Sequence, residues 1–465
     1  MTTQIKFYNS LTNQKEDFTP LKEGEVSIYN CGVTVYDRCH LGHARGAINF
    51  DVLRRFLESQ GLAVKYVKNY TDIDDKMINR AGEREITVAE LATEMIAMHD
   101  RDMESLGVNA PTLAPRATEH IPEIVSLIEQ LIEKGHAYEA GGDVFFKVDS
   151  FKDYGKLSGK NIEDLIAGQR VEVQDTKENP LDFVLWKSAK PNEPKWESPW
   201  GEGRPGWHIE CSAMSQKHLG ANFDIHAGGS DLIFPHHENE IAQSCCATGE
   251  SYANYWLHNG MIKIESQKMS KSLGNFATIE DLVKVYNPEL IRFFILSSQY
   301  RKSIDFSHDA LKVASEGLDK IYQALKRGAE TFGEAIKNTN SDEFFDALAD
   351  DLNTAQAISV LFDLAKALNI ETGQKRGQKL IGRLVGLGEV LGLLQHNPEK
   401  WFNESRIKEE GTAEIDPALI ESLIAERVTA RETKNWARAD EIRDQFSEMG
   451  VILEDKDGKT TWKRK

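Results

Sequence analysis

The chain has 465 residues, 40% of them hydrophobic and 28% charged, and its formal net charge at pH 7 is −18. The length predicts several domains, the composition excludes a disordered chain, and the acidic charge means that any nucleic-acid partner would need a local basic patch. No apolar run approaches the roughly 18 residues of a membrane span, and residues 1–18 lack the apolar stretch of a secretory signal, so a cytoplasmic protein without a membrane partner is expected.

The first predicted unit is a strand, a helix and a second strand. Residues 26–37 are rich in β-branched and aromatic side chains and predict a strand that runs into a turn. Apolar residues at helical spacing follow from Ala44 to Leu57, Gly61 ends the helix, and residues 63–67 predict the next strand. Such a unit implies a parallel sheet, whose ligands bind at the carboxyl ends of the strands.

The remaining segments form a mixed middle and a helical end. Helices are predicted at 86–106 and 120–132, a hairpin turn at Gly141-Gly142, a turn-rich insertion at 147–205, and further strands at 223–226 and 256–264. Later helices are predicted at 310–325, 343–348, 354–368, 379–394, 418–429 and 436–448. A loop-like linker is expected at 397–417, and Asp457-Gly458 predicts a final hairpin.

Two short motifs suit the handling of phosphate. His40-Leu41-Gly42-His43 lies where the first strand turns into a helix, and two imidazoles there can donate hydrogen bonds to a phosphoryl group. The segment Lys268 to Ser272 (KMSKS) can place two ammonium groups against a departing pyrophosphate. Each motif alone is also compatible with an ordinary surface turn, but in this order they form the paired signature of class I aminoacyl-tRNA synthetases.

The five cysteines lie at positions 31, 39, 211, 245 and 246, and their odd number argues against a disulfide framework. Cys31 leaves the first strand, Cys211 lies in a polar and aromatic segment, and His236 and Glu240 share one face of a predicted helix start. These four are candidate zinc ligands, although the spacing alone, without a close CxxC pair, favours a half-buried cysteine and a capped, charged helix start. Cys39, Cys245 and Cys246 are expected to be structural.

Longer segments resemble the cysteinyl-tRNA synthetase family. They are YNCGVTVYDRCHLGHARG, NYTDIDDKMINRA, GWHIECSAMSQKHLG, FDIHAGGSDLIFPHHENEIAQS and KMSKSLGNF, followed by DDLNTAQAISVLFDLAKALN. The resemblance implies zinc ligands at Cys31, Cys211, His236 and Glu240, ATP-activating residues at His40, His43, Lys268 and Lys271, adenosine contacts at Gly228, Gly229 and Asp231, and an amino-acid pocket lined by Thr71, Trp207 and His226.

The resemblance also implies an α/β architecture with a Rossmann-like parallel-sheet catalytic domain. Its halves are expected at 1–125 and 206–302, with a connective insertion at 126–205, a helical bundle at 303–396, and a linker and anticodon-binding domain at 397–465. In the tail, Arg427, Arg431 and Arg438 with Trp436 suit single-stranded RNA, although interleaved acidic residues are typical of a solvated helix.

The implied activity is a cysteine–tRNA ligase, which joins L-cysteine to ATP and then to the 3′ end of cysteine tRNA. Hydrophobic packing separates cysteine from serine poorly, whereas one zinc per chain can select the thiol, and Mg²⁺ would accompany the ATP. A monomer is expected. A cysteine ligase that acts on an amino sugar in mycothiol synthesis resembles the same catalytic half, and an inactive zinc-bearing RNA-binding relative is a third alternative. The full tail and the intact motifs favour the synthetase over both.

Overall fold

The computed structural model describes residues 4–160, 176–264, 267–268, 278–402, 417–456 and 459–464. They divide into two compact units. One comprises residues 1–279, 295–307 and 341–358, and the other residues 280–294, 308–340 and 359–465. In the part of the chain that is described, no helix is both long and apolar enough to cross a membrane.

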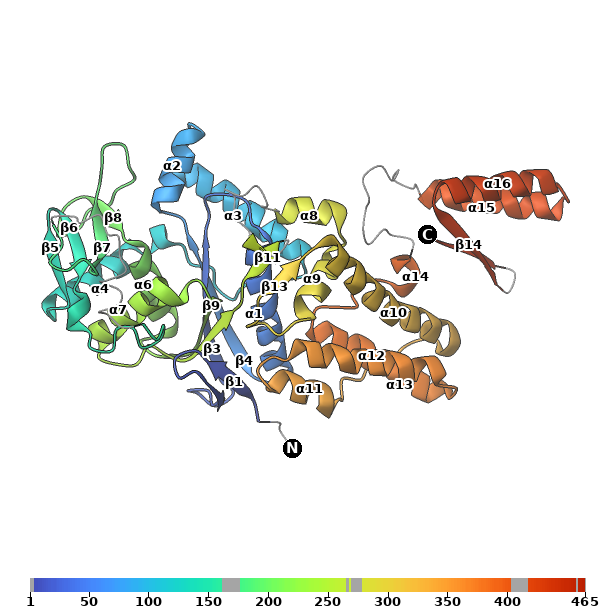
Figure 1. The fold of residues 1–465 in the computed structure, drawn as a ribbon, viewed down its shortest axis with the longest axis horizontal. Coiled ribbons are helices and arrows are strands. Elements are labelled where there is room, and N and C mark those ends of the chain that lie inside the picture. The colour runs from blue at the N-terminus through green and yellow to red at the C-terminus, as the bar shows by residue number, and fades with distance from the viewer. Residues whose placement is uncertain are drawn as a thin grey trace. The chain divides into compact units, whose positions relative to one another are not determined.

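A parallel four-stranded sheet in the order β10-β9-β3-β4 forms the centre of the first unit (Figure 1). Its strands are β3 (Glu25–Thr34), β4 (Ala63–Thr71), β9 (Phe223–Gly229) and β10 (Ala253–Asn259). The predicted strand–helix–strand unit is confirmed, because β3 and β4 pair in parallel and α1 (Leu41–Ser59) connects them. The α/β fold class expected from the sequence is therefore correct.

The two faces of this sheet carry different neighbours. Along β4, Tyr66, Lys68 and Tyr70 point toward α1 and α3 (Val88–Ser105). The alternate residue Val67 packs in one cluster with Cys211 of α6 (Trp207–Leu219) on the other face. Because side chains alternate along a strand, one strand thus supplies residues to two separate sites.

The insertion forms a second sheet, antiparallel, in the order β5-β6-β7-β8. The predicted hairpin is confirmed: Gly141 and Gly142, both with positive φ, join β5 (Ala137–Ala140) to β6 (Asp143–Phe146). The sequence did not indicate β7 (Phe183–Ser188) or β8 (Gly203–Pro205) as strands. They pair with residues far away in sequence, and the prolines and charges around them hide the alternation.

Other elements of the first unit are short. They are β1 (Lys6–Asn9), β2 (Gln14–Asp17), α2 (Asp75–Glu83), η1 (Ala117–Glu119), α4 (Ile121–Glu133), η2 (Val148–Ser150), η3 (Ile233–His237), α7 (Glu238–Thr248), β11 (Ile262–Ile264), β12 (Gln267–Lys268), β13 (Ile304–Phe306) and α11 (Asp342–Ala349). Helices α4, α6 and α7 share a hydrophobic core with the second sheet, which anchors the insertion beside the central sheet.

The second unit is mainly helical, as predicted. It contains most of α8 (Ile279–Val285), α9 (Pro288–Leu296) and α12 (Thr354–Ile370), together with α10 (His308–Phe332), α13 (Gln374–Val390), α14 (Pro398–Trp401), α15 (Pro417–Glu432), α16 (Trp436–Glu448), β14 (Val451–Lys456) and β15 (Lys459–Arg464). The last two helices and the terminal hairpin have a core of their own, around Ile420, Phe446 and Trp462.

One expectation for this unit was wrong. The linker was expected to be loop-like from residue 397, but residues 398–401 form α14, and Trp401 is buried. Its ring stacks on Tyr322 at 4.0 Å, and its indole nitrogen donates to Asp319 Oδ1 at 2.7 Å. Trp401 is a single aromatic residue in a polar segment, and its packing partners are distant in the sequence. A local sequence pattern therefore could not predict its burial. The rest of the expected linker, residues 403–416, lies outside the described residues.

We expect Gly32→Ala to destabilise the first unit. A Cβ at Gly32 would lie 1.6 Å from the carbonyl oxygen of Asn69 on β4, so β3 and β4 would have to separate. Overpacking of this kind costs about 1–3 kcal/mol or more. Calorimetric unfolding should show a lower Tm. Gly82→Ala in α2, where nothing lies within 4 Å of the added Cβ, is the matched control. Equal Tm values for both variants would contradict the close approach of the two strands.

Candidate active site

Four side chains predicted as metal ligands converge from three separate parts of the chain. Cys31 comes from β3, Cys211 from α6, and His236 and Glu240 from η3 and α7. All four are buried, and one donor atom from each lies within 4.8 Å of the others. Cys31 Sγ is 3.7 Å from Cys211 Sγ and 3.3 Å from Glu240 Oε1, and His236 Nε2 is 3.1 Å from the same carboxylate oxygen.

This donor set fits a tetrahedral metal ion. Bonds of about 2.0–2.3 Å from sulfur, nitrogen and oxygen to one ion place the donors roughly 3.3–3.8 Å apart. The observed separations of 3.1, 3.3 and 3.7 Å are close to that range. Two thiols and a carboxylate buried in contact gain from a shared cation, because isolated buried charge is costly.

The two thiols of the cluster differ in acidity. A hydrogen bond from Cys31, helped by His236, lowers the pKa of Cys211 to about 6 despite its burial. Burial raises the pKa of Cys31 well above its ordinary value. The lowered pKa of Cys211 favours its thiolate, which is the form that binds metal.

Residues around the cluster hold Glu240 in place. Its second oxygen, Oε2, lies 2.9 Å from His226 Nε2 and accepts a hydrogen bond from the Tyr252 hydroxyl at 3.0 Å. His226 is fully buried and stacks on Trp256 at 4.3 Å. The structure therefore places His226, an expected amino-acid-pocket residue, directly behind Glu240. Sequence reasoning missed Tyr252, for which no local signal exists.

A second group of four donors overlaps the first. Cys31, His226, His237 and Glu240 also place one donor atom each within 4.8 Å of one another. His237 Nδ1 lies 2.8 Å from His258 Nε2, so one nitrogen of the His237 ring already has a hydrogen-bond partner. Sequence reasoning passed over His237, although its place beside His236 was a visible signal.

The two other residues expected in the amino-acid pocket flank the cluster. Trp207 is 37% exposed and stacks on His236, with ring centroids 4.3 Å apart, so it lies between the cluster and the surface. Thr71, at the end of β4, donates a hydrogen bond of 2.9 Å to Glu210 Oε2. Glu210 is fully buried, and burial raises its pKa well above the ordinary value. The sequence analysis did not single out Glu210.

The two histidines of HLGH cap α1. His40 is the N-cap residue, and its Nδ1 accepts from the Gly42 amide at 3.1 Å, while His43 Nδ1 accepts from the His40 amide at 3.3 Å. The rings stack 3.7 Å apart. A neutral imidazole whose Nδ1 accepts must carry its proton on Nε2. The capping therefore prepares an Nε2–H donor on each ring.

The described residues that flank the second motif lie in β12 and beside the first motif. Lys268 belongs to β12, which pairs with β11, whereas Lys271 and most of KMSKS lie outside the described residues. Directly after that segment, Thr278 forms a backbone bridge with His40, and the Ile279 amide donates to the Cys39 carbonyl at 3.0 Å. Thr278 and Ile279, which follow the motif in the sequence, thus lie next to HLGH.

Gly228 and Gly229 end β9 at the same sheet edge. A Cβ on Gly229 would lie 2.5 Å from Asp231 Oδ1, and one on Gly228 would lie 2.8 Å from His237 Cε1. A side chain at either position would therefore require Asp231 or His237 to shift. The expected contact of these residues with adenosine stays a prediction.

The predicted tRNA-binding residues occur in the second unit. Arg427 and Arg431 belong to α15, and Trp436 and Arg438 to α16. Trp436 is 59% exposed, which leaves its ring open for stacking. Arg438 Nε and Nη1 donate to Glu426 and Glu441 at 2.8 and 2.9 Å, so acidic neighbours already engage this guanidinium.

Comparisons with known proteins identify the family of the chain. Residues 17–316 match the catalytic domain of the tRNA synthetases class I (C), residues 343–395 the DALR domain, and residues 417–462 the cysteinyl-tRNA ligase anticodon binding domain. The chain belongs to the cysteine–tRNA ligase family. A cysteine–tRNA ligase of Methylococcus capsulatus is 52% identical over 99% of this chain and its own full length, and one of Haemophilus influenzae is 50% identical over the same shares. The resemblance inferred from the sequence is confirmed.

Solved structures of more distant synthetases share the fold. Mycobacterium tuberculosis methionyl-tRNA synthetase in complex with methionyl-adenylate has a TM-score of 0.56 and 15% identity, covering 79% of this chain and 89% of that chain. The Agrobacterium radiobacter LeuRS in a ternary complex with tRNA and LeuAMS has a TM-score of 0.58 and 12% identity, covering 83% and 85%. At these identities the likeness concerns the class I fold alone.

Proposed function

We propose that this member of the cysteine–tRNA ligase family joins L-cysteine to ATP, forming cysteinyl-adenylate, and then transfers cysteine to the 3′-terminal adenosine of cysteine tRNA. The observation that carries the proposal is the sheet edge where β3 ends. There Cys31 belongs to the metal-fitting cluster, and His40 of the HLGH motif, only nine residues further along the chain, caps α1.

The metal in this proposal is one zinc ion held by Cys31, Cys211, His236 and Glu240. Two sulfurs, an imidazole and a carboxylate are ordinary zinc ligands. When bound, zinc supplies a preference for a sulfur ligand over a hydroxyl, which separates cysteine from serine better than packing does. His226 and Tyr252 orient Glu240, and Trp207 holds the ring of His236.

Activation requires no general base, because the cysteine carboxylate attacks the α-phosphate as it is. The work of the protein is then positioning and charge stabilisation. The Nε2–H groups of His40 and His43 donate to the phosphate oxygens as negative charge builds up. Lys268 and Lys271 neutralise the departing pyrophosphate, and Mg²⁺ enters with ATP. Gly228, Gly229 and Asp231 contact the adenosine, and Thr71 lies beside the amino acid.

The C-terminal tail, residues 417–464, is the part of the chain that binds the tRNA. Support comes from the match of residues 417–462 to an anticodon binding domain and from the exposed ring of Trp436. Arg427, Arg431 and Arg438 accompany it, and Arg438 would exchange its carboxylate partners for phosphate. The same match weighs against an amino-sugar ligase. The domain boundaries, a monomeric state and a cytoplasmic location remain predictions.

We expect Cys211→Ser to lose the bound zinc. Loss of a thiolate ligand should raise the KM for cysteine by at least about tenfold, with little change in the KM for ATP, since Cys211 contacts the metal cluster rather than the nucleotide motifs. Cys245→Ser is the matched control, because Cys245 belongs to neither donor group. The measurements are metal analysis and cysteine-dependent ATP–pyrophosphate exchange. Equal zinc content and equal KM values in both variants would refute the ligand assignment.

We expect His40→Asn to separate the two roles of His40. Asparagine is a good N-cap residue, so stability should change little, whereas His40→Ala should lose about 1 kcal/mol. Both variants lack the Nε2–H donor, and each should form adenylate about a hundredfold more slowly, as after loss of one oxyanion donor. Single-turnover adenylate formation and thermal unfolding measure the two effects. Normal adenylate formation in His40→Asn would exclude His40 as a phosphate donor.

Deletion of residues 416–465 should leave ATP–pyrophosphate exchange largely intact while charging of cysteine tRNA falls steeply. The reason is that the tail has its own core, around Ile420, Phe446 and Trp462, and every activation residue lies before it. Both reactions are assayed at two salt concentrations, because phosphate contacts make tRNA binding, but not exchange, weaken with salt. Equal charging by the truncated and full chains would show that the tail does not read the tRNA.

A further inference from the structure

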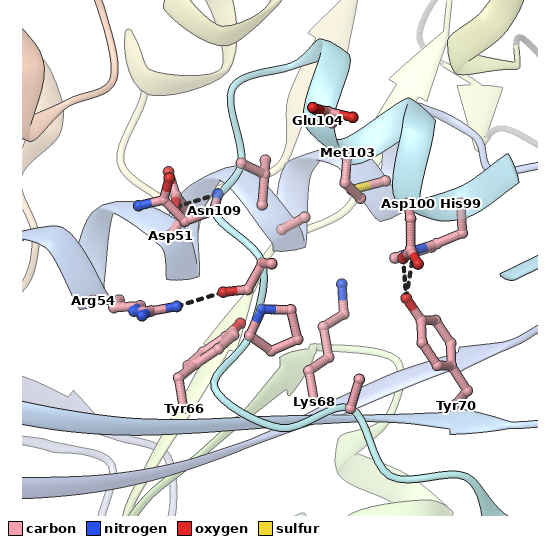
Figure 2. Close-up of a pocket in the computed structure, with 15 residues that line it drawn as sticks. Asp51, Arg54, Tyr66, Lys68, Tyr70, His99, Asp100, Met103, Glu104 and Asn109 are labelled. Carbon is pink, nitrogen blue, oxygen red and sulfur yellow. Dashed lines mark hydrogen bonds and ion pairs between the residues drawn. The ribbon is translucent and has the colours of Figure 1, made fainter. Parts of the chain in front are cut away.

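A cavity of about 460 Å³ lies on the face of the central sheet opposite the metal cluster (Figure 2). Helices α1 and α3, strand β4 and residues 108–114 enclose it. Its volume is within the range of roughly 300–1,000 Å³ of sites that bind small organic molecules. On β4, Asn69 and Thr71 face the metal cluster and Glu210, whereas Lys68 and Tyr70 face the cavity. The cavity is therefore separate from the proposed substrate site.

The side chain of Lys68 extends from β4 into the middle of this cavity (Figure 2). Among the residues that the structure describes, its ammonium group makes no hydrogen bond and no ion pair. Burial lowers the pKa of Lys68, and electrostatic interactions with Cys39 and Asp100 only partly offset that effect. The other cation in the lining is satisfied, because Arg54 donates to the Ala110 carbonyl at 2.6 Å and to Glu58 at 2.8 Å. A partly buried ammonium that faces open space favours an anionic ligand.

The carboxylates in the cavity lining favour an anionic ligand that carries a single negative charge. Two carboxylates of the lining are already engaged: Asp51 by Arg55 at 2.8 Å and by the Asn109 amide at 2.9 Å, and Asp100 by the Tyr70 hydroxyl and His99. Glu104, exposed on the rim, adds further negative charge. A phosphate dianion would face these carboxylates with one lysine to balance it, whereas a monocarboxylate is matched by Lys68 alone.

The rest of the lining is suited to an apolar body. The apolar part of the lining comprises Met103 of α3, Val108 and Pro111 of the covering segment, and the aromatic ring of Tyr66. We propose that the cavity binds a small organic monocarboxylate, whose carboxylate pairs with Lys68 and whose apolar part packs against Tyr66, Met103 and Pro111. The bound molecule is distinct from L-cysteine, whose proposed site is the metal cluster on the opposite face of the sheet.

The test uses a series of phenylalkanoates, from benzoate to 5-phenylpentanoate, titrated into the full-length protein by calorimetry and ligand-observed NMR. At least one member should bind. Lys68→Met should weaken it by about ten- to a hundredfold, as expected for one charge-assisted contact, and the neutral amide of the same compound should weaken similarly. Lys65→Met is the matched control, because Lys65 is on the same strand but donates to the His218 carbonyl. Ala114→Trp, which adds bulk to the lining without changing charge, should abolish binding.

Four outcomes would overturn the proposal. They are no binding by any member of the series, equal affinity of the wild type and Lys68→Met, tighter binding of phenyl phosphate than of the carboxylate, and displacement of the probe by saturating L-cysteine and ATP. The last result would place the probe in the substrate site. Thermal unfolding of each variant shows whether a loss of binding reflects a loss of folding.

Discussion

The structure depends on one constraint: two thiols, an imidazole and a carboxylate meet at a buried point. Such groups are costly to bury unless they share a cation or hydrogen bonds, so the elements that carry them must be positioned closely. This fixes β3 against β4, where only Gly32 allows the approach to Asn69, and it fixes α6 and the η3–α7 turn over the sheet. His226, Tyr252 and Trp207 then hold the ligands from behind and from the side.

The nucleotide side of the site depends on backbone geometry rather than on burial. The capping of α1 uses the Nδ1 atoms of His40 and His43 as acceptors, and this makes Nε2 the protonated nitrogen of each neutral ring. The N-terminal cap of α1 thus also sets the histidine tautomer that the proposed phosphate binding requires. The bridge between Thr278 and His40 then places a residue that follows the second motif in the sequence beside the first motif.

Strand β4 connects the two faces of the sheet. Its period of two sends Asn69 and Thr71 to the substrate side and Lys68 and Tyr70 to the cavity beside α1. Strand β4 therefore contributes to two sites. The family resemblance implies the residues of the metal and substrate site, but it says nothing of the cavity around Lys68. Lys68 is inconspicuous in the sequence, since an isolated lysine in a strand is usually solvent-exposed.

The sequence by itself determined the parallel α/β unit, the helical second half, the terminal hairpin and the family. These follow from local periodicity, turn residues and contiguous motifs, which act over a few residues. The four metal-ligand candidates were also named from the sequence, but their convergence was decided by tertiary structure, because spacings of 180 and 25 residues carry no geometric information. Tertiary structure alone revealed β7 and β8, the burial of Trp401, the support of Glu240 by Tyr252, and the cavity around Lys68. Each depends on partners distant in the chain, and burial and pairing between distant segments exist only once the chain has folded.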